Sequence, residues 1–186
     1  MSDFDPRAAF LAIGGWVGQL IAGTRPDQLD LPTPDDGWTA RDLLKHIVQV
    51  EAGMCGLIAP DSPMPATEPT DETFSQVYQA RLDHITKAFD EPGILERPTK
   101  GFFGELPAAD VIGRFCPEFL VHGWDLAKAT GQDPEGPKET SERILEASRT
   151  AIPESGRNPK AFGAPQTPPA GAGPTTKLAA WLGRTV

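Results

Sequence analysis

The chain has 186 residues, of which 39% are hydrophobic and 23% are charged. These values are ordinary for one globular domain, or one domain with an appendage, that is long enough to bury a core. The formal net charge of −9 excludes the basic stripe that a nucleic-acid surface needs. No apolar run approaches the ~18 residues of a membrane span, and the acidic residues 1–6 do not resemble a signal peptide. We therefore expect a cytoplasmic protein.

Hydrophobic periodicity predicts helices along most of the chain, and no segment shows a convincing strand pattern. The predicted helices run from Pro6 to Ala22, from the N-cap Thr39 to Ile58, from Thr70 or Asp71 to Pro92-Gly93, from Pro107 to Thr130 and from Pro137 to Ala151. Four long amphipathic helices with intervening loops predict an all-α four-helix bundle.

Proline, glycine and capping residues mark where these helices begin, end and bend. Thr39 followed by Asp42 is a near relative of the capping box. Gly131 is placed to cap the end of the fourth helix. Pro117, inside that helix, removes a backbone hydrogen bond and predicts a kink. Three glycines between residues 14 and 18 weaken the first helix, but they would allow a close helix crossing or the approach of a ligand.

The remaining segments are predicted to be irregular. Residues 94–106 are expected to hold at most a short extended turn at 102–104. Residues 154–186 are rich in proline, glycine and alanine and predict an irregular tail with one turn at residues 177–182. We expect this tail to pack on, or extend from, a bundle formed by residues 1–153.

The two cysteines agree with a reducing compartment, in which thiols stay free. Cys55 and Cys116 each lie among apolar residues inside a predicted helix. The sequence has no Cys-x-x-Cys pair, the spacing typical of redox or metal-thiolate sites. We expect both cysteines to be small buried side chains.

The pair Glu118 and His122 is the most informative local pattern, because the chain has only three histidines. A separation of four residues places both side chains on one helix face, with Cβ atoms ~6 Å apart, where they could hold one divalent ion. If His46 of the second helix converges with them, two imidazoles and one carboxylate would leave coordination positions open, as in catalytic zinc and non-haem iron sites. Asp125 shares that face and is either an acceptor that orients His122 or a surface charge.

Other interpretations are open on the residues alone. A glutamate and a histidine at this spacing usually make a modest surface contact. His84 lies among charged residues and is expected on a solvated face. Arg81 is a candidate for orienting a cofactor but fits a surface role on the third helix. Ser62 and Ser75 have no evident histidine partner, and no glycine-rich phosphate loop is present.

Two longer segments resemble a known family. Residues 37–46, Gly-Trp-Thr-Ala-Arg-Asp-Leu-Leu-Lys-His, resemble the Trp-Thr-x-x-Asp-Leu-x-x-His motif of the DinB-like metal-binding bundles. Residues 118–131, Glu-Phe-Leu-Val-His-Gly-Trp-Asp-Leu-Ala-Lys-Ala-Thr-Gly, resemble the Glu-x-x-x-His-x-Trp-Asp-Leu-Ala-x-Ala-x-Gly signature of the metal-binding domain of mycothiol-dependent maleylpyruvate isomerase. Residues 161–165 and 182–184 are similar to the tail of its short actinobacterial members.

The resemblance implies an up-down-down-up bundle that holds a divalent metal on His46, Glu118 and His122. Zinc or nickel is the expected metal, and iron is a further candidate. The resemblance also implies a low-molecular-weight thiol such as mycothiol as cofactor, for which Asp125 and Arg81 are candidate contacts.

The expected function is a thiol-dependent transferase or isomerase that acts on a small-molecule substrate; no catalytic residue is assigned. The alternative is a non-catalytic protein that binds a metal or a small ligand. We expect no nucleic-acid or membrane partner, and a homodimer is one open oligomeric state.

Overall fold

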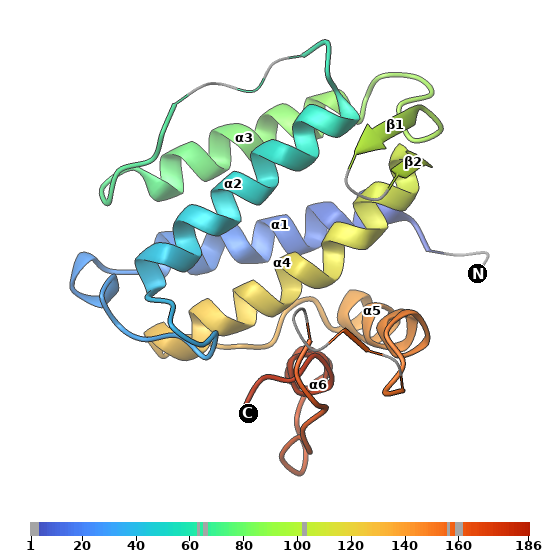
Figure 1. The fold of residues 1–186 in the computed structure, drawn as a ribbon. Helices are drawn as coiled ribbons and strands as arrows, with labels where there is room; N and C mark the ends of the chain where they lie inside the picture. Colours follow the sequence, from blue (N-terminus) through green and yellow to red (C-terminus); the bar gives the residue numbers. More distant parts are fainter. Residues whose placement is uncertain (1–3, 63, 65–66, 102–103, 156, 159–161) are drawn as a thin grey trace.

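Four long helices pack side by side as a bundle (Figure 1). They are α1 (Pro6–Gly23), α2 (Ala40–Ile58), α3 (Phe74–Ala88) and α4 (Ala108–Thr130). α1 and α2 each pack against both α3 and α4. α1 and α4 run in one direction and α2 and α3 in the other (Figure 1), so the predicted all-α, up-down-down-up bundle is confirmed. The structure, a computed structural model, describes residues 4–62, 64, 67–101, 104–155, 157–158 and 162–186.

The first helix crosses the third at close range, and a glycine makes this crossing possible. A Cβ atom added at Gly14 would lie 2.8 Å from a methyl group of Leu82 on α3. The Tyr78 hydroxyl donates a hydrogen bond to the Gly14 carbonyl at 3.1 Å. Of the two roles predicted for these glycines, the structure shows the close helix crossing.

The second helix begins as its sequence predicts. Thr39 accepts a hydrogen bond from the Asp42 amide at 3.3 Å, and the Asp42 carboxylate accepts one from the Thr39 amide at 3.1 Å. This reciprocal pair is the capping box. It fixes the direction in which α2 leaves the preceding connector, and therefore the position of His46 almost two turns further on.

The third helix begins later than predicted, at Phe74. Thr70 and Thr73 form a turn instead of a first helical turn: the Thr70 amide donates to the Thr73 hydroxyl at 2.8 Å, and the Thr73 amide donates to the Thr70 carbonyl at 2.9 Å. Hydroxyl side chains compete with helical backbone hydrogen bonds in this way.

The expectation that the chain has no strands is wrong. β1 (Pro98–Gly101) and β2 (Gly104–Pro107) pair in antiparallel register as a small hairpin immediately before α4. Strands of four residues that contain proline and glycine are too short to show an alternating pattern. The predicted extended turn included residues 102 and 103, which lie outside the described residues.

The C-terminal region is more regular than predicted. α5 (Lys138–Ala151) is followed by α6 (Pro174–Trp181), where only one turn was expected, and α6 packs against both α4 and α5. The Glu135 carboxylate accepts hydrogen bonds from the first amides of α6, those of Thr175 and Thr176. The Trp124 indole of α4 donates to the Thr176 hydroxyl at 3.0 Å. These contacts over 40 residues or more stabilise a helix that local propensity alone does not predict.

Both cysteines are buried, as predicted. Burial raises the pKa of Cys55 to about 11, with Glu51 adding to the effect, and it raises the pKa of Cys116 to about 12. Neither thiol is therefore ionised near neutral pH. Within the described residues, no helix has both the length and the apolar content needed to cross a membrane.

Two glycines allow opposite stability changes to be predicted for the same substitution. Gly131 ends α4 with φ of 72°, a region in which an L-residue costs ~1–2 kcal/mol. Gly53 lies inside α2, and a Cβ atom there would meet nothing within 4 Å. We expect Gly131→Ala to lower the free energy of unfolding by ~1 kcal/mol and Gly53→Ala to raise it by ~0.5–1 kcal/mol. Urea unfolding measures the change in the free energy of unfolding for each variant. Equal changes for the two substitutions would contradict the role of Gly131 as the cap of α4.

Candidate metal centre

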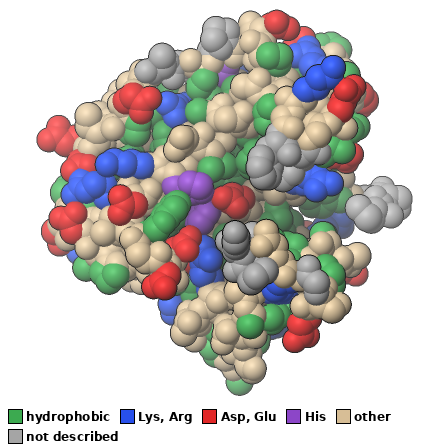
Figure 2. Space-filling model, in the orientation of Figure 1, with side chains coloured by type: hydrophobic (Ala, Val, Ile, Leu, Met, Phe, Trp, Pro, Cys, Tyr) green, Lys and Arg blue, Asp and Glu red, His purple; other side chains and the backbone are tan. Residues whose placement is uncertain are grey.

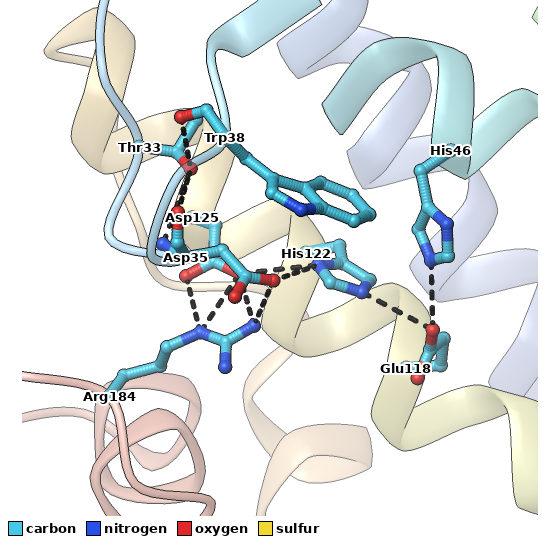
Figure 3. A network of polar contacts seen from close by, with 8 residues as sticks. All are labelled: Thr33, Asp35, Trp38, His46, Glu118, His122, Asp125 and Arg184. Atoms are coloured by element: carbon cyan, nitrogen blue, oxygen red, sulfur yellow. Dashed lines mark hydrogen bonds and ion pairs between the residues drawn. The ribbon is translucent and has the colours of Figure 1, made fainter. Parts of the chain in front are cut away.

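The three predicted ligands converge at one point, between α2 and α4 (Figure 3). One carboxylate oxygen, Glu118 Oε1, lies 3.1 Å from His46 Nε2 and 3.2 Å from His122 Nε2. One potential ligand atom from each residue lies within 4.8 Å of the other two. The separation of four residues on α4 and the capped start of α2 therefore place all three donor atoms around a common point.

Glu118 and His122 each stabilise the charged form of the other. Burial opposes protonation of His122, but its hydrogen bonds with Asp125 and Glu118 outweigh burial and raise its pKa to about 9. Burial also opposes ionisation of Glu118, yet hydrogen bonds with His122 and His46 hold its pKa well below the usual range. Without a metal, a protonated His122 therefore faces the ionised Glu118 carboxylate. A divalent cation would have to replace that proton, because metal ligands bind deprotonated.

The other nitrogen of His122 contacts a second carboxylate. His122 Nδ1 lies 3.2 Å from Asp125 Oδ2, and Asp125 is completely buried. The surface-charge alternative for Asp125 is therefore wrong, and the orienting position is the one observed. When Nε2 loses its proton to bind a cation, an acceptor at Nδ1 keeps the remaining ring proton there and leaves the Nε2 lone pair free for that cation.

Three residues that the sequence analysis did not assign to the site complete it. The Arg184 guanidinium pairs with Asp125 and with Asp35 of the connector before α2. The Trp38 ring stacks on the His122 ring, with planes 4° apart and centroids separated by 6.0 Å, and meets His46 edge-on. Trp38 lies in the recognised motif, so the motif could have indicated it.

The connector places Asp35 and Trp38 through its own turn. The Thr33 amide donates to the Trp38 carbonyl at 2.9 Å, and the Trp38 amide donates to the Asp35 carbonyl at 3.1 Å. Gly37 adopts φ of 80° within this turn, a conformation that favours glycine. The turn therefore brings a carboxylate and an aromatic ring against α4.

The cluster is open on one side. The side chains of His46 and Glu118 keep 29% and 41% of their exposure, whereas that of His122 keeps 8%. Figure 2 shows histidine side chains reaching the surface beside acidic and basic side chains, in a hollow between the bundle and the C-terminal elements. Two imidazoles and one carboxylate, open to solvent on one side, form a donor set suited to zinc, nickel or iron, with positions left for water or substrate.

Arg81 is buried, so the surface role considered for it is wrong. It is 6% exposed, and it donates hydrogen bonds to the carbonyls of Val48 and Thr67, at 2.8 Å and 2.9 Å. Nearby Glu51 is completely buried, and neither of its carboxylate oxygens has a hydrogen-bond partner in the described part of the chain. Arg81 thus belongs to the bundle interior, and its predicted contact with a cofactor stays a prediction.

His84 has a partner that the sequence did not reveal. Its Nε2 lies 3.2 Å from the Ser62 hydroxyl and 3.0 Å from the Ser62 carbonyl, and His84 is half-buried. His84 is therefore less solvated than predicted, and the statement that Ser62 lacks a histidine partner is wrong. The loop after α2 folds back on α3, a contact that sequence spacing does not encode.

The fold and the cluster define a class of protein: a four-helix bundle that presents two histidines and a glutamate at an open site. Residues 11–127 match the mycothiol maleylpyruvate isomerase N-terminal domain family. The match covers more than half of the chain, and the chain belongs to this family. The resemblance of the two motifs is thereby confirmed.

Similar proteins are known from sequence and from structure. Uncharacterised proteins from two strains of Mycobacterium tuberculosis are 33% identical over 183 residues, which cover 98% of this chain and 99% of those proteins. Two crystal structures of the mycothiol-dependent maleylpyruvate isomerase, one of them a histidine-to-alanine mutant, have TM-scores of 0.65 and 0.64 at 15% and 14% identity. Each similarity covers 84% of this chain and 74% of that chain and shows a shared fold.

Proposed function

We propose that the protein is a divalent-metal enzyme that uses a low-molecular-weight thiol to transfer a group to, or isomerise, a small-molecule substrate. The observation that carries the proposal is the single Glu118 oxygen held between His46 and His122, whose Nε2 atoms belong to two different helices. In this proposal the three side chains hold the metal, with zinc or nickel as the first candidates and iron as the next.

The metal, when bound, supplies Lewis acidity and lowers the pKa of a bound thiol, so that thiolate forms near neutral pH. The residues of the chain position this chemistry. Asp125 holds the proton of His122 on Nδ1, and Trp38 limits rotation of the same ring by stacking on it. The exposed edges of His46 and Glu118 leave an approach for thiol and substrate.

The thiol is the part of the proposal that depends on the family. The solved neighbours are described as mycothiol-dependent, and neither cysteine of this chain can replace an external thiol, because both are buried with raised pKa values. Mycothiol or a similar thiol is therefore the proposed cofactor. We further propose a cytoplasmic location, where such thiols are kept reduced.

A second candidate function is a non-catalytic protein that binds a metal or a small ligand. The same three side chains would hold the ion, and the open side of the cluster would take a ligand instead of two reactants. The two candidates differ only in turnover, so one preparation can separate them.

The test uses protein purified without chelator. Metal content is measured first by elemental analysis, and a thermal-shift screen then compares mycothiol with glutathione and cysteine, since a bound ligand raises the melting temperature by mass action. Thiol-dependent conversion of maleylpyruvate and of simple electrophiles follows, with and without the metal. We expect one equivalent of metal and metal-dependent turnover with mycothiol. One equivalent of metal without turnover would favour the binding protein, and neither bound metal nor a thermal shift with any thiol would contradict both candidates.

A further inference from the structure

His122 lies between two sets of potential metal ligands, one at each ring nitrogen. At Nε2 it meets Glu118, together with His46. At Nδ1 it lies 3.2 Å from Asp125 Oδ2 and 3.9 Å from Asp35 Oδ2. Each group contains three potential ligand atoms within 4.8 Å of one another. One imidazole is thus shared by two donor sets, and a divalent cation could be drawn to either side of the ring.

The side chain of Arg184 already fills the second set. Its Nε donates to both carboxylate oxygens of Asp125, at 3.0 Å and 3.1 Å. Its Nη2 donates to Asp125 Oδ2 at 2.9 Å and to Asp35 Oδ2 at 2.7 Å. A single nitrogen therefore bridges the two carboxylate oxygens that a metal ion on this side would need (Figure 3).

The chemistry of arginine suits this position. A guanidinium stays protonated and offers several donors in one plane. Burial opposes its charge here, but the hydrogen bond with Asp125 and the negative charges of Asp125 and Asp35 outweigh burial and raise the pKa of Arg184. It neutralises acidic groups without offering a lone pair, so it cannot itself bind a metal. Lysine would supply the charge with a less extended set of donors, and a neutral side chain would supply neither.

We propose that Arg184 is a positioning residue that excludes divalent cations from the Asp35–Asp125 side of His122 and so keeps metal on the Nε2 side. This selectivity rests on the proposed metal site at His46, Glu118 and His122. Arg184 reaches the site from the C-terminal tail, 59 residues after Asp125 and 149 residues after Asp35. The tail therefore contributes a fixed cation to the metal centre of the bundle.

The test measures metal stoichiometry in the full-length protein. Wild type, Arg184→Met and Arg184→Lys are stripped of metal, dialysed against Zn²⁺ or Co²⁺ at neutral pH and analysed for metal per chain. We expect Arg184→Met to bind one equivalent more than wild type, with His122 releasing its remaining ring proton to solvent and bridging the two ions as an imidazolate, and to show a second Co²⁺ absorption component. Arg184→Lys should behave as wild type. Adding Asp35→Asn to Arg184→Met should remove the extra equivalent, because it removes one of the three donors.

Equal stoichiometry and equal Co²⁺ spectra in wild type and Arg184→Met would overturn the proposal and leave Arg184 as a tether for the tail. Arg184→Gln provides a second neutral variant if Arg184→Met does not fold, which circular dichroism checks. The proposed function is tested separately by the metal stoichiometry of the wild-type protein. This stoichiometry should be one ion per chain and should be lost in His46→Ala. A wild-type protein that binds no metal would contradict the function, whereas the difference between wild type and Arg184→Met would still decide whether Arg184 excludes cations.

Discussion

Replacing His122 by alanine should abolish stoichiometric metal binding while the protein stays folded. His122 is the ligand that meets Glu118 through Nε2 and is held through Nδ1 by Asp125. Loss of a partner that merely orients a ligand costs ~10–100-fold in metal affinity, so loss of the ligand itself should cost more than 100-fold. Asp125 keeps its pairing with Arg184 in the variant, and no buried carboxylate loses its only partner. Isothermal titration with Zn²⁺ measures the change.

The chain offers a matched control for this experiment. His84 is also a helical histidine, but it lies on α3, away from the cluster, and hydrogen-bonds to Ser62. His84→Ala removes one imidazole without touching the cluster, so its metal stoichiometry should equal that of wild type. If His122→Ala keeps full metal affinity, or if His84→Ala loses as much affinity as His122→Ala, the ion is bound elsewhere and the site described above is wrong.

Replacing Glu51 by glutamine should stabilise the protein, and the stabilisation should increase with pH. Burial raises the pKa of Glu51 to about 9, although the nearby charge of Arg81 opposes the shift. Both carboxylate oxygens lack a hydrogen-bond partner among the described residues. A protonated carboxyl is therefore the form that the folded chain favours, and glutamine is its neutral counterpart.

The direction of this pH dependence follows from the number of protons that the folded and the unfolded chain bind. From the ordinary pKa of 4.5 up to about 9, the folded chain retains a proton that the unfolded chain has released. Wild-type stability should then fall as pH rises through this window, by at most ~1.4 kcal/mol per pH unit. Glu51→Gln removes this pH dependence. The free energy of unfolding of the variant should therefore exceed that of wild type only slightly at pH 5, and by a few kcal/mol at pH 8.

Urea unfolding of wild type and Glu51→Gln at several pH values between 5 and 8 checks this prediction. Glu142→Gln serves as the control, because Glu142 is exposed on α5, and surface substitutions usually change stability by less than ~0.5 kcal/mol. A stability difference between Glu51→Gln and wild type that does not change with pH would mean that Glu51 is ionised in the folded chain.

The sequence predicted those parts of the site that depend on local geometry. Glu118 and His122 share a helix face because they are four residues apart, and Thr39 with Asp42 sets the start of the helix that carries His46. Helical periodicity and capping are short-range effects, so they can be read without knowledge of packing. The family resemblance then predicted that His46 lies close to Glu118 and His122, which residue spacing alone could not predict.

Contacts between distant segments could not be predicted. Arg184 meets Asp125 and Asp35 only because the tail folds back over α4, and no local pattern marks such a pairing. Arg81 looked like a surface residue because its side chain is long and charged, yet carbonyls of α2 and of the following loop accept hydrogen bonds from its two Nη atoms inside the protein. In both cases the partner that makes burial favourable is supplied by the fold.

A crystal structure of the protein grown with Zn²⁺, with an anomalous difference map at the zinc edge, would show whether His46, Glu118 and His122 hold a metal ion. We expect one peak ~2.0–2.2 Å from His46 Nε2, Glu118 Oε1 and His122 Nε2, the usual lengths of bonds from zinc to nitrogen and oxygen. The Arg184 guanidinium should remain between Asp35 and Asp125. A map without a peak among these three atoms, or with its only peak on the Nδ1 side of His122, would contradict the account.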